Sequence, residues 1–529
     1  MIGIGFILLC LISSTLSFAP NGNAPGIKRQ PIKSTEGTAR TKIGRLSMKK
    51  VVLIGGGHAH LQVIKAFNKR DRPRDWHVTL VDKASFASYS GMVPGCISNL
   101  YEKTDVQILL QPLAEWASVD FLKENVINID PEDQRVFLES GAILDYDVLS
   151  VDIGSKSKGL EIPGVLENTI PTRPIDLLVD KIQETRNSLR EGDPVKLFVV
   201  GGGIAGIELA MCIRSSFESI VEHLDVTILD SSYELLPTES VLCKDAMSEL
   251  LVEKKITVRH GCRVSCVNSK IIELEDGSQI PYTHMVWACG ASAHSLSSNL
   301  RDAGISVSED GWIKVGPTLQ TLSHNNIFAA GDCANIEGLR DPETGQEKES
   351  PPKAGVYAVR SGPVLVENIS RHLKTGESSC NDNESLTSFV PQESFLKLLV
   401  CGDGTALGFR FGLPLKGKWV WQLKDAIDMM FMDLFRVETL PDLSEVEGSG
   451  YDTSQYDQQT HSEICRLSAE EGARLLLRTD DDVDFQVAWK VLRDMMADES
   501  YADEVIQTYH KYRIIGPKLV ANSLYTTLL

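Results

Sequence analysis

Two apolar runs rich in β-branched residues lead directly into glycine-rich turns in this chain. The first run covers residues 50–54 and precedes Gly55-Gly56-Gly57, after which apolar side chains recur at helical spacing over residues 61–68. The second run covers residues 195–200 and precedes Gly201-Gly202-Gly203 and another helical stretch. Each pattern predicts a strand, a tight turn and a helix. Such units bind dinucleotides, because the glycines let the backbone approach a pyrophosphate at the amide end of the helix.

The first of these units has an incomplete glycine motif. Its first two glycines permit the tight turn, but His60 occupies the position at which a third glycine lets the helix pack closely on the strand. A further strand over residues 77–81 ends at Asp82, where an acid would hydrogen-bond the adenosine ribose. His58 is assigned to the cofactor site as an imidazole near the pyrophosphate. The alternative is that His58 and His60 only fill space at the start of the helix.

The second unit has the complete motif, since Gly201, Gly203 and Gly206 stand at the three glycine positions. The next strand, residues 225–229, ends at Asp230, which would bond the ribose 2′-hydroxyl. A carboxylate there repels a 2′-phosphate, and no arginine follows in the next three residues. The sequence therefore predicts NADH rather than NADPH as the bound nucleotide.

A third segment connects the first unit to a flavin. Residues 326–333 form an apolar strand that ends in Gly331-Asp332, similar to flavoprotein segments in which the aspartate accepts a hydrogen bond from the ribityl chain of FAD. Residues 146–155 resemble the strand and glycine turn that close a flavin domain before the chain leaves it. Four further phrases are typical of one family: GGGHAH at 55–60, YSGMVPG at 89–95, KAGVYAVR at 353–360 and WVWQLKD at 419–425.

On these residues the chain, over roughly residues 49–373, resembles the pyridine nucleotide-disulfide oxidoreductase superfamily of flavoproteins with two dinucleotide-binding domains. Within it, the chain is similar to a branch related to type II NADH dehydrogenases and to the oxidoreductase module fused to selenide, water dikinase. The resemblance implies an α/β fold with two Rossmann-like domains, the NAD(P)H-binding one inserted in the FAD-binding one. The expected divisions are a targeting leader (1–48), the FAD-binding domain (49–165 and 291–375), the NAD(P)H-binding domain (166–290), a small C-terminal α+β domain with an amphipathic helix (385–437) and an acidic linker with a helical appendage (438–529).

The resemblance also implies an activity in which NADH reduces FAD and electrons then pass to a quinone or another small acceptor. Glu208 is the candidate catalytic residue near the nicotinamide, although the helix dipole alone also favours an acid at the start of a helix. Ala354 would begin a helix whose amino end points at the flavin pyrimidine. Two alternatives stay open: a flavin- and NAD-binding regulatory protein with slow turnover, and a reductase in selenium metabolism.

Two departures from the family narrow this expectation. Disulfide reductases carry a CxxxxC pair beside the flavin, but residues 88–101 hold only Cys96, so a dithiol mechanism is not expected. Type II NADH dehydrogenases typically carry Ala-Gln at the quinone site, where this chain has Ala354-Gly355. That difference leaves quinone in doubt as the acceptor.

Composition and charge limit the partners. A net charge of −19 argues against nucleic acid, because phosphate binding needs clustered Lys and Arg. The 11 cysteines have neither the spacing of a metal site nor that of a disulfide framework. Residues 418–436 form a helix rich in Trp, Met and Phe, which suits peripheral contact with a membrane, a lid over a hydrophobic substrate, or a homodimer or domain interface.

The first 48 residues are interpreted as a targeting leader. An apolar run over residues 2–12 is followed by a basic, Pro- and Ser-containing stretch, as in import signals. Phe18 lies in a junction that resembles the cleavage motif of plastid leaders in secondary-plastid algae, so the resemblance implies a plastid protein. The alternatives are an ordinary secretory signal and a cytoplasmic protein that starts at Met48.

Overall fold

The computed structural model describes residues 48–341, 344–375, 386–392, 395–410 and 412–443. Nearly all of the predicted leader and most of the predicted 438–529 appendage lie outside the described residues. Within them, no helix is both long enough and apolar enough to span a membrane.

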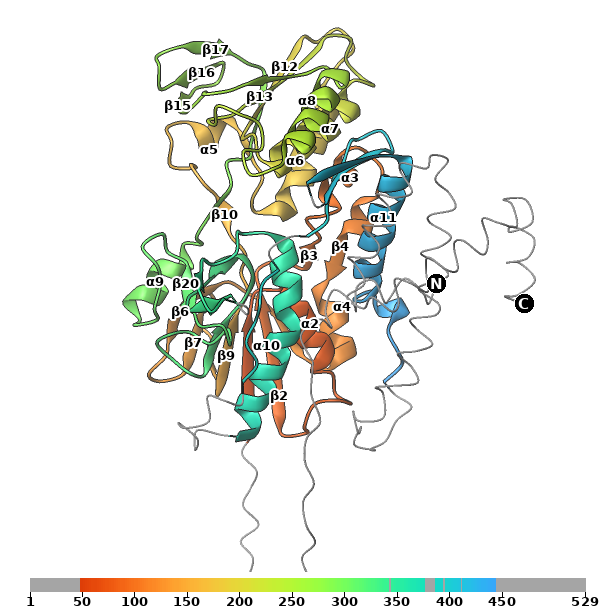
Figure 1. Ribbon diagram of the computed structural model, residues 1–529. Coiled ribbons are helices and arrows are strands. Elements are labelled where there is room, and N and C mark those ends of the chain that lie inside the picture. Colours follow the sequence, from red (N-terminus) through yellow and green to blue (C-terminus); the bar gives the residue numbers. More distant parts are fainter. Residues whose placement is uncertain (1–47, 342–343, 376–385, 393–394, 411, 444–529) are drawn as a thin grey trace, which may run out of the picture.

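The first sheet is parallel and carries the first glycine turn. Its central strand, β1 (Lys49–Ile54), has neighbouring strands on both sides and is buried over its last four residues. This burial explains the continuous apolar run in the sequence. Helices α2 (His58–Ala66) and α10 (Gly355–Thr375) pack against each other beside it (Figure 1). The strand order is β21 (Ile327–Ala329), β9 (Val148–Val151), β1 (Lys49–Ile54), β2 (Trp76–Asp82) and β5 (Asp120–Lys123).

The second sheet is also parallel and forms a separate unit above the first in the view of Figure 1. Helices α7 (Ile204–Phe217) and α8 (Val241–Glu253) pack against its strands. The strand order is β11 (Ile170–Pro171), β18 (His284–Trp287), β12 (Val195–Val200), β13 (Leu224–Leu229) and β14 (Ile256–Arg259).

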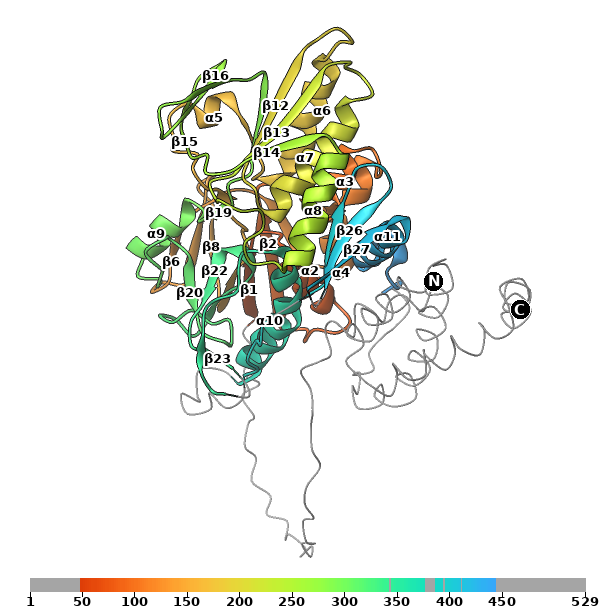
Figure 2. The same cartoon turned by 45° about the horizontal axis from the view of Figure 1, so that its top comes forward.

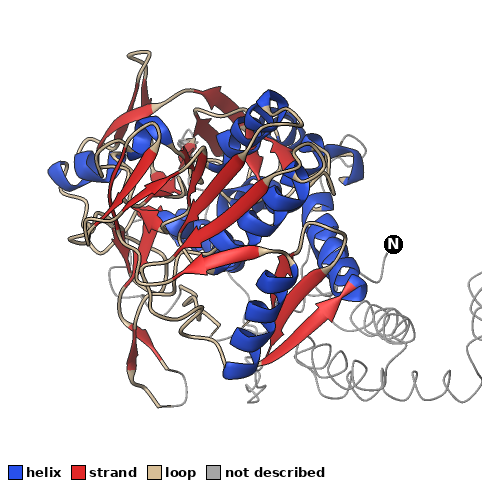
Figure 3. Ribbon diagram, turned by 90° about the horizontal axis from the view of Figure 1, so that it is seen from above, coloured by secondary structure: helices blue, strands red, loops and turns tan. Residues whose placement is uncertain are grey.

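The chain crosses between the two units twice, through β10 (Lys156–Ser157) and β19 (Ala291–Ser292), which pair antiparallel. Strand β9 precedes the second unit in the sequence and β21 follows it, yet the two strands are neighbours in the first sheet. The second unit is therefore inserted in the first, as predicted. Figure 3 shows helices and strands interleaved across the body, in agreement with the predicted α/β class.

A C-terminal meander of β25 (Lys397–Val400), β26 (Ala406–Arg410) and β27 (Leu413–Gly417) precedes helix α11 (Lys418–Asp433). Helix α11 packs on this meander, and both lie beside the second unit (Figure 2). Strand β27 was not predicted, because its Pro414 and the flanking glycines are typical of turns; proline is tolerated here on an edge strand. Several bulky residues of α11, among them Phe431 and Met432, are buried inside the protein and are therefore not exposed to a membrane. Membrane contact through the rest of the helix stays a prediction.

Smaller elements complete the fold. The other helices are α3 (Val93–Ile97), α4 (Leu110–Ala117), α5 (Val165–Asn168), α6 (Leu178–Ser188) and α9 (Leu296–Asp302), with short 3-10 helices η1 (Lys103–Val106), η2 (Ile175–Leu177), η3 (Gly331–Cys333) and η6 (Val437–Thr439). Three small sheets have two strands each: β3 (Phe86–Ser88) with β4 (Gln107–Leu109), β20 (Ile313–Val315) with β22 (Ala334–Ile336), and β23 (Leu339–Arg340) with β24 (Glu347–Lys348). One three-stranded sheet consists of β6 (Val126–Asp130), β7 (Arg135–Leu138) and β8 (Ile143–Asp145). Another consists of β15 (Val264–Val267), β16 (Ile271–Leu274) and β17 (Gln279–Pro281).

Candidate active site

The first glycine turn lies between the ends of three strands. Gly55 has a φ of +90°, and a Cβ built on it would lie 2.3 Å from the carbonyl oxygen of Asp152. Asp82 stands at the end of β2, where its carboxylate accepts hydrogen bonds from the backbone N–H of Gly56 at 2.6 Å and of Ala84 at 2.7 Å. The predicted ribose-binding acid is thus directly beside the glycine turn.

His60 fills the place of the missing third glycine. Its side chain is fully buried, with Nδ1 2.6 Å from the carbonyl oxygen of Gly55 and Nε2 2.8 Å from Oγ of Ser150. Burial lowers its pKa to about 4, so the ring is neutral at physiological pH. Because a carbonyl only accepts hydrogen bonds, we assign the proton to Nδ1, and Nε2 accepts from the Ser150 hydroxyl.

His58 has a different environment from His60. Its ring packs against Phe431 of α11, at 5.5 Å between ring centroids, and against Tyr89, at 5.6 Å, and these two rings stack on each other at 4.5 Å. Burial lowers its pKa to about 4, while the negative charge of Asp332 opposes that shift. Its Nε2 is buried and has no hydrogen-bond partner among the described residues. His58 therefore keeps a ring nitrogen without a hydrogen-bond partner inside the protein.

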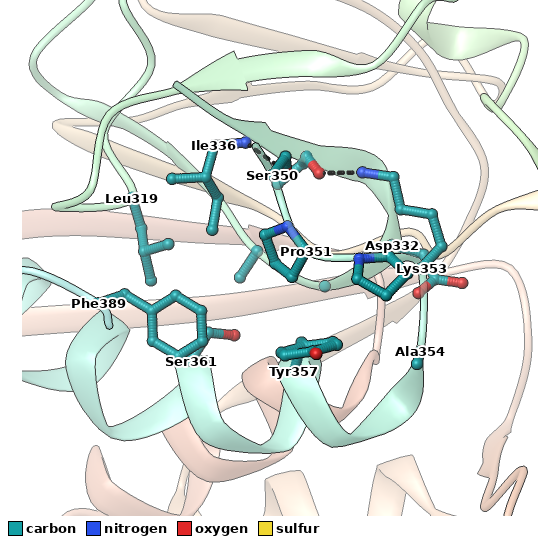
Figure 4. Close-up of a pocket in the computed structure, with 14 residues that line it drawn as sticks. Leu319, Asp332, Ile336, Ser350, Pro351, Lys353, Ala354, Tyr357, Ser361 and Phe389 are labelled. Atoms are coloured by element: carbon teal, nitrogen blue, oxygen red, sulfur yellow. Dashed lines mark hydrogen bonds between the residues drawn. The ribbon is translucent and has the colours of Figure 1, made fainter. Parts of the chain in front are cut away.

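Asp332 and the start of helix α10 meet at the edge of a small hollow. Figure 4 shows Asp332, Lys353 and Ala354 together at one end of it. The Asp332 carboxylate accepts a hydrogen bond from Oγ of Ser155 at 2.8 Å and lies 3.4 Å from Nη2 of Arg173. The sequence had indicated Gly331, Asp332 and Ala354, but not the polar neighbours that hold Asp332 in place.

These residues fit an FAD molecule. Gly55 and Gly57 carry no side chains of their own that would block a pyrophosphate, and Asp82 stands at the adenosine end. At the other end, Asp332 lies beside an open hollow and the amino end of α10. The amides of that helix end would favour negative charge on the reduced flavin ring.

The second glycine turn repeats the geometry with a complete motif. A Cβ on Gly201, whose φ is +121°, would lie 2.4 Å from the carbonyl oxygen of Ala288, and a Cβ on Gly206 would lie 2.0 Å from the carbonyl oxygen of Gly201. Around Gly203 there is open space. Asp230 ends strand β13 beside this turn, with Nδ1 of His260 3.7 Å from its carboxylate. The sequence did not indicate His260.

Glu208 of helix α7 does not face open solvent. Its Oε1 accepts a hydrogen bond from the backbone N–H of Val400 in the C-terminal meander, at 2.7 Å. Burial raises its pKa to about 7, although the positive charge of Lys424 acts in the opposite direction. Near neutral pH this carboxyl group can therefore either hold or release a proton.

Lys424 and Asp428 form a buried ion pair on α11, 2.6 Å apart and each 5% exposed. Lys424 Nζ also donates a hydrogen bond to the carbonyl oxygen of Gly91 at 2.6 Å. Burial disfavours the charged lysine, but the negative charges of Asp428 and Glu208 outweigh that effect and raise its pKa. We call Glu208, Lys424 and Asp428 the buried acid–lysine cluster. The pattern of residues 418–436 did not single out Lys424, although a lysine and an aspartate at i,i+4 on an apolar helix were the available signal.

Cys96 is the cysteine on helix α3, at the position where disulfide reductases carry their pair. It is buried, and burial raises its pKa to about 11. A thiol with such a pKa has little thiolate at neutral pH and is a poor nucleophile. Among the described residues, no three His, Cys, Asp or Glu side chains are grouped closely enough to hold a metal ion.

The comparison with known families decides the assignment of the chain. A model of the pyridine nucleotide-disulphide oxidoreductase family matches residues 49–362, which is more than half of the sequence. The chain belongs to this family. Its members use FAD and a pyridine nucleotide, so the predicted family, fold class and cofactors are confirmed, and the chain is an oxidoreductase.

Curated relatives and solved structures agree with that assignment. The type II NADH:quinone oxidoreductase of Staphylococcus aureus is 23% identical over 400 residues, which cover 72% of this chain and 94% of that protein. An NDH2 structure from Plasmodium falciparum in complex with NADH has a TM-score of 0.59 at 16% identity and covers 75% of this chain and all of that one. The sulfide:quinone oxidoreductase of Aquifex aeolicus has a TM-score of 0.58 at 19% identity and covers 74% of this chain and 93% of that one.

Proposed function

We propose that this oxidoreductase passes electrons from NADH through FAD to a quinone, without a redox-active disulfide. Bound FAD would accept a hydride from the nicotinamide and deliver two electrons to the second substrate. The name of the Staphylococcus aureus relative supports a quinone as that substrate. The confirmed cofactors leave the acceptor as the main question.

The observation that carries this proposal is the buried acid–lysine cluster. Reduction of a quinone to a quinol consumes two protons, whereas a one-electron acceptor consumes none. Lys424 carries a proton in a buried site, and Glu208, with a pKa of about 7, can replace that proton near neutral pH. Proton transfer from a positioned side chain accelerates such steps by a factor of about 10² to 10⁴. A buried lysine beside two carboxyl groups is therefore suited to an acceptor that takes up protons.

The lone Cys96 supports a route that does not use a disulfide. Transfer of electrons through a dithiol needs two cysteines in contact and a thiolate at the flavin. Cys96 is buried with a raised pKa, and no second cysteine lies on helix α3. Electrons would then pass directly from the flavin to the acceptor.

Gly355 bears on the shape of the acceptor site. A Cβ at this position would lie 3.3 Å from Oγ of Ser90, so the Ser90 hydroxyl approaches the start of helix α10 closely. Relatives that carry glutamine here have a longer side chain in this place. We propose that Gly355 and Ser90 together replace that side chain, and that quinone remains the acceptor despite the departure in sequence.

Asp230 supports NADH as the electron donor. Its carboxylate stands beside the second glycine turn, where it would accept a hydrogen bond from a ribose hydroxyl and repel a 2′-phosphate.

The test of this function is the reoxidation of NADH-reduced enzyme by a water-soluble quinone under anaerobic conditions, compared between wild type and Lys424→Met. We expect the variant to be reduced by NADH within about twofold of the wild-type rate and reoxidised about 100-fold more slowly, because its proton donor is missing. Lys416→Met, which removes a surface lysine paired with Glu253, is the matched control and should behave as wild type.

Glu208→Gln provides a second variant, because the loss of Lys424 leaves Asp428 buried without its partner and destabilises the fold. We expect Glu208→Gln to slow reoxidation by quinone and not reduction by NADH. Equal reoxidation rates in all three variants, or rapid reoxidation of wild type by disulfides but not by quinones, would contradict the proposal.

A further inference from the structure

Asp152 follows strand β9, and its carboxylate lies under the first turn of helix α2. Oδ2 accepts hydrogen bonds from the backbone N–H of Ala59 at 2.9 Å and of His60 at 3.2 Å. A Cβ built on Gly57 would lie 2.2 Å from the carboxyl carbon of Asp152, and one built on Gly331 would lie 2.5 Å from Oδ1. The carboxylate therefore lies between the glycine turn and the Gly331-Asp332 turn, next to the end of helix α2 whose amides would face the pyrophosphate.

The second dinucleotide fold has an alanine at the corresponding position. The backbone N–H of Asp152 donates to the carbonyl oxygen of Ile54 at 2.8 Å, and that of Ala288 donates to the carbonyl oxygen of Val200 at 2.8 Å. A Cβ on the first glycine of each turn would meet the carbonyl oxygen of Asp152 and of Ala288, respectively. Ala288 presents only a methyl group, so strand β18 places no carboxylate at the amides of α7. The acid is thus a property of the FAD-binding fold alone.

The surroundings of Asp152 are mainly negative or neutral. Burial raises its pKa to about 7, the two amide hydrogen bonds oppose that shift, and the charges of Asp332 and Asp82 add to it. His60 is neutral, and burial raises the pKa of the neighbouring Cys333 thiol to about 12. The cations of this region lie near Asp332: Arg173 is 3.4 Å from it, and burial lowers the pKa of Lys353 although the negative charge of Asp332 opposes that shift.

An FAD pyrophosphate would bring further negative charge to the same amides. Two like charges in a buried site disfavour each other strongly, and a carboxyl group in that situation takes up a proton. A protonated Asp152 can still accept the amide hydrogen bonds through one oxygen, and its O–H becomes a donor.

We propose that Asp152 takes up a proton when FAD binds, so that the affinity of this chain for FAD falls as the pH rises. The proton comes from solvent and returns there when FAD dissociates, and no covalent bond changes. This inference rests on the FAD cofactor and not on the identity of the electron acceptor.

The test is the dissociation constant for FAD, measured by diluting the full-length holoenzyme to equilibrium and following the fluorescence of released flavin between about pH 6 and pH 9. For wild type we expect a constant value below about pH 7 and a roughly tenfold weakening per pH unit above it, as linkage of one proton requires. Asp152→Asn, which mimics the protonated acid, should bind FAD with the same affinity across the range. Asp133→Asn removes an exposed acid and should keep the wild-type slope.

Asp152→Ala serves as a second variant in case the asparagine disturbs the fold, and it should also show no slope. A flat wild-type profile, or a slope that persists in Asp152→Asn and Asp152→Ala, would overturn the proposal. Quinone reductase activity plays no part in this measurement, so failure of the proposed acceptor leaves it unaffected. A chain that binds no FAD at any pH would contradict the cofactor assignment and the inference with it.

Discussion

The two dinucleotide-binding folds of this chain achieve the same close packing of helix on strand with different residues. In the NAD(P)H-binding fold, Gly206 lets the helix approach the carbonyl oxygen of Gly201, and a Cβ there would lie 2.0 Å from it. In the FAD-binding fold, His60 stands at that position and bonds to the carbonyl oxygen of Gly55 at 2.6 Å. The helix thus packs closely on the strand because a side chain is absent in one fold, and because a side chain forms a hydrogen bond in the other. An imperfect glycine motif therefore does not by itself indicate a weak cofactor site.

The comparison also explains why only one of the folds has a buried titratable group under its helix. Asp152 and Ala288 correspond in backbone position, but only the acid reaches the helix amides. Three variants test this difference between the two folds.

The largest effect is expected from Gly206→Val. A side chain at this position would collide with the carbonyl oxygen of Gly201 and push helix α7 away from strand β12. Overpacking of this kind costs about 1–3 kcal/mol, and it displaces the amides that face the pyrophosphate. We expect NADH to bind at least about 100-fold more weakly while FAD stays bound. The flavin content of the purified variant measures FAD binding, and an anaerobic titration with NADH measures NADH binding. Gly192→Ala is the control, because a Cβ at Gly192 would lie in open space.

The second effect concerns stability and its dependence on pH. His60→Ala removes two buried hydrogen bonds and leaves a cavity, so we expect a loss of about 3 kcal/mol in the free energy of unfolding near pH 7. The native pKa of His60, about 4, lies below its unfolded value of about 6.5. The stabilisation is thus complete above pH 6.5 and is lost as the pH falls towards 4.

Urea unfolding of wild type and His60→Ala at several pH values checks this prediction. The difference in stability should narrow below about pH 6.5. A difference that is constant between pH 7 and pH 4 would mean that His60 is not held neutral in the folded protein.

The smallest effect is expected from Ala288→Asp, which gives the NAD(P)H-binding fold the acid of the other fold. We expect NADH binding to weaken about tenfold near pH 8 and to recover at lower pH, because the new carboxyl group must be protonated when the nucleotide binds. Ala288→Asn is the control for size. Equal, pH-independent weakening in both variants would show that volume rather than charge decides.

The arrangement of strands, turns and helices could be predicted from the sequence because parallel strands buried on both faces have continuous apolar runs. Residues 50–54 and 195–200 were expected as strands, and the structure has Lys49–Ile54 and Val195–Val200. The glycines of the turns could also be interpreted from the sequence, because a tight turn with a positive φ favours glycine whatever the rest of the fold is.

The role of Asp152 could not be predicted in the same way. It was interpreted as part of a strand, because nothing in the local pattern shows that its side chain meets amides 92 and 93 positions earlier in the sequence. Lys424 could not be predicted for the same reason, since its hydrogen bond to Gly91 and its electrostatic interaction with Glu208 involve segments far away in the chain. A buried charge acquires its function from neighbours that only the tertiary fold supplies.

The central claim is that the two folds hold FAD and NADH so that electrons pass from the nucleotide through the flavin to a quinone. Anaerobic titration of the purified full-length protein with NADH, followed by addition of a water-soluble quinone, tests it most directly. We predict that the absorbance of oxidised flavin disappears with about one NADH per flavin and returns in full when the quinone is added. Flavin that stays oxidised with NADH, or that stays reduced with quinone, would contradict the account.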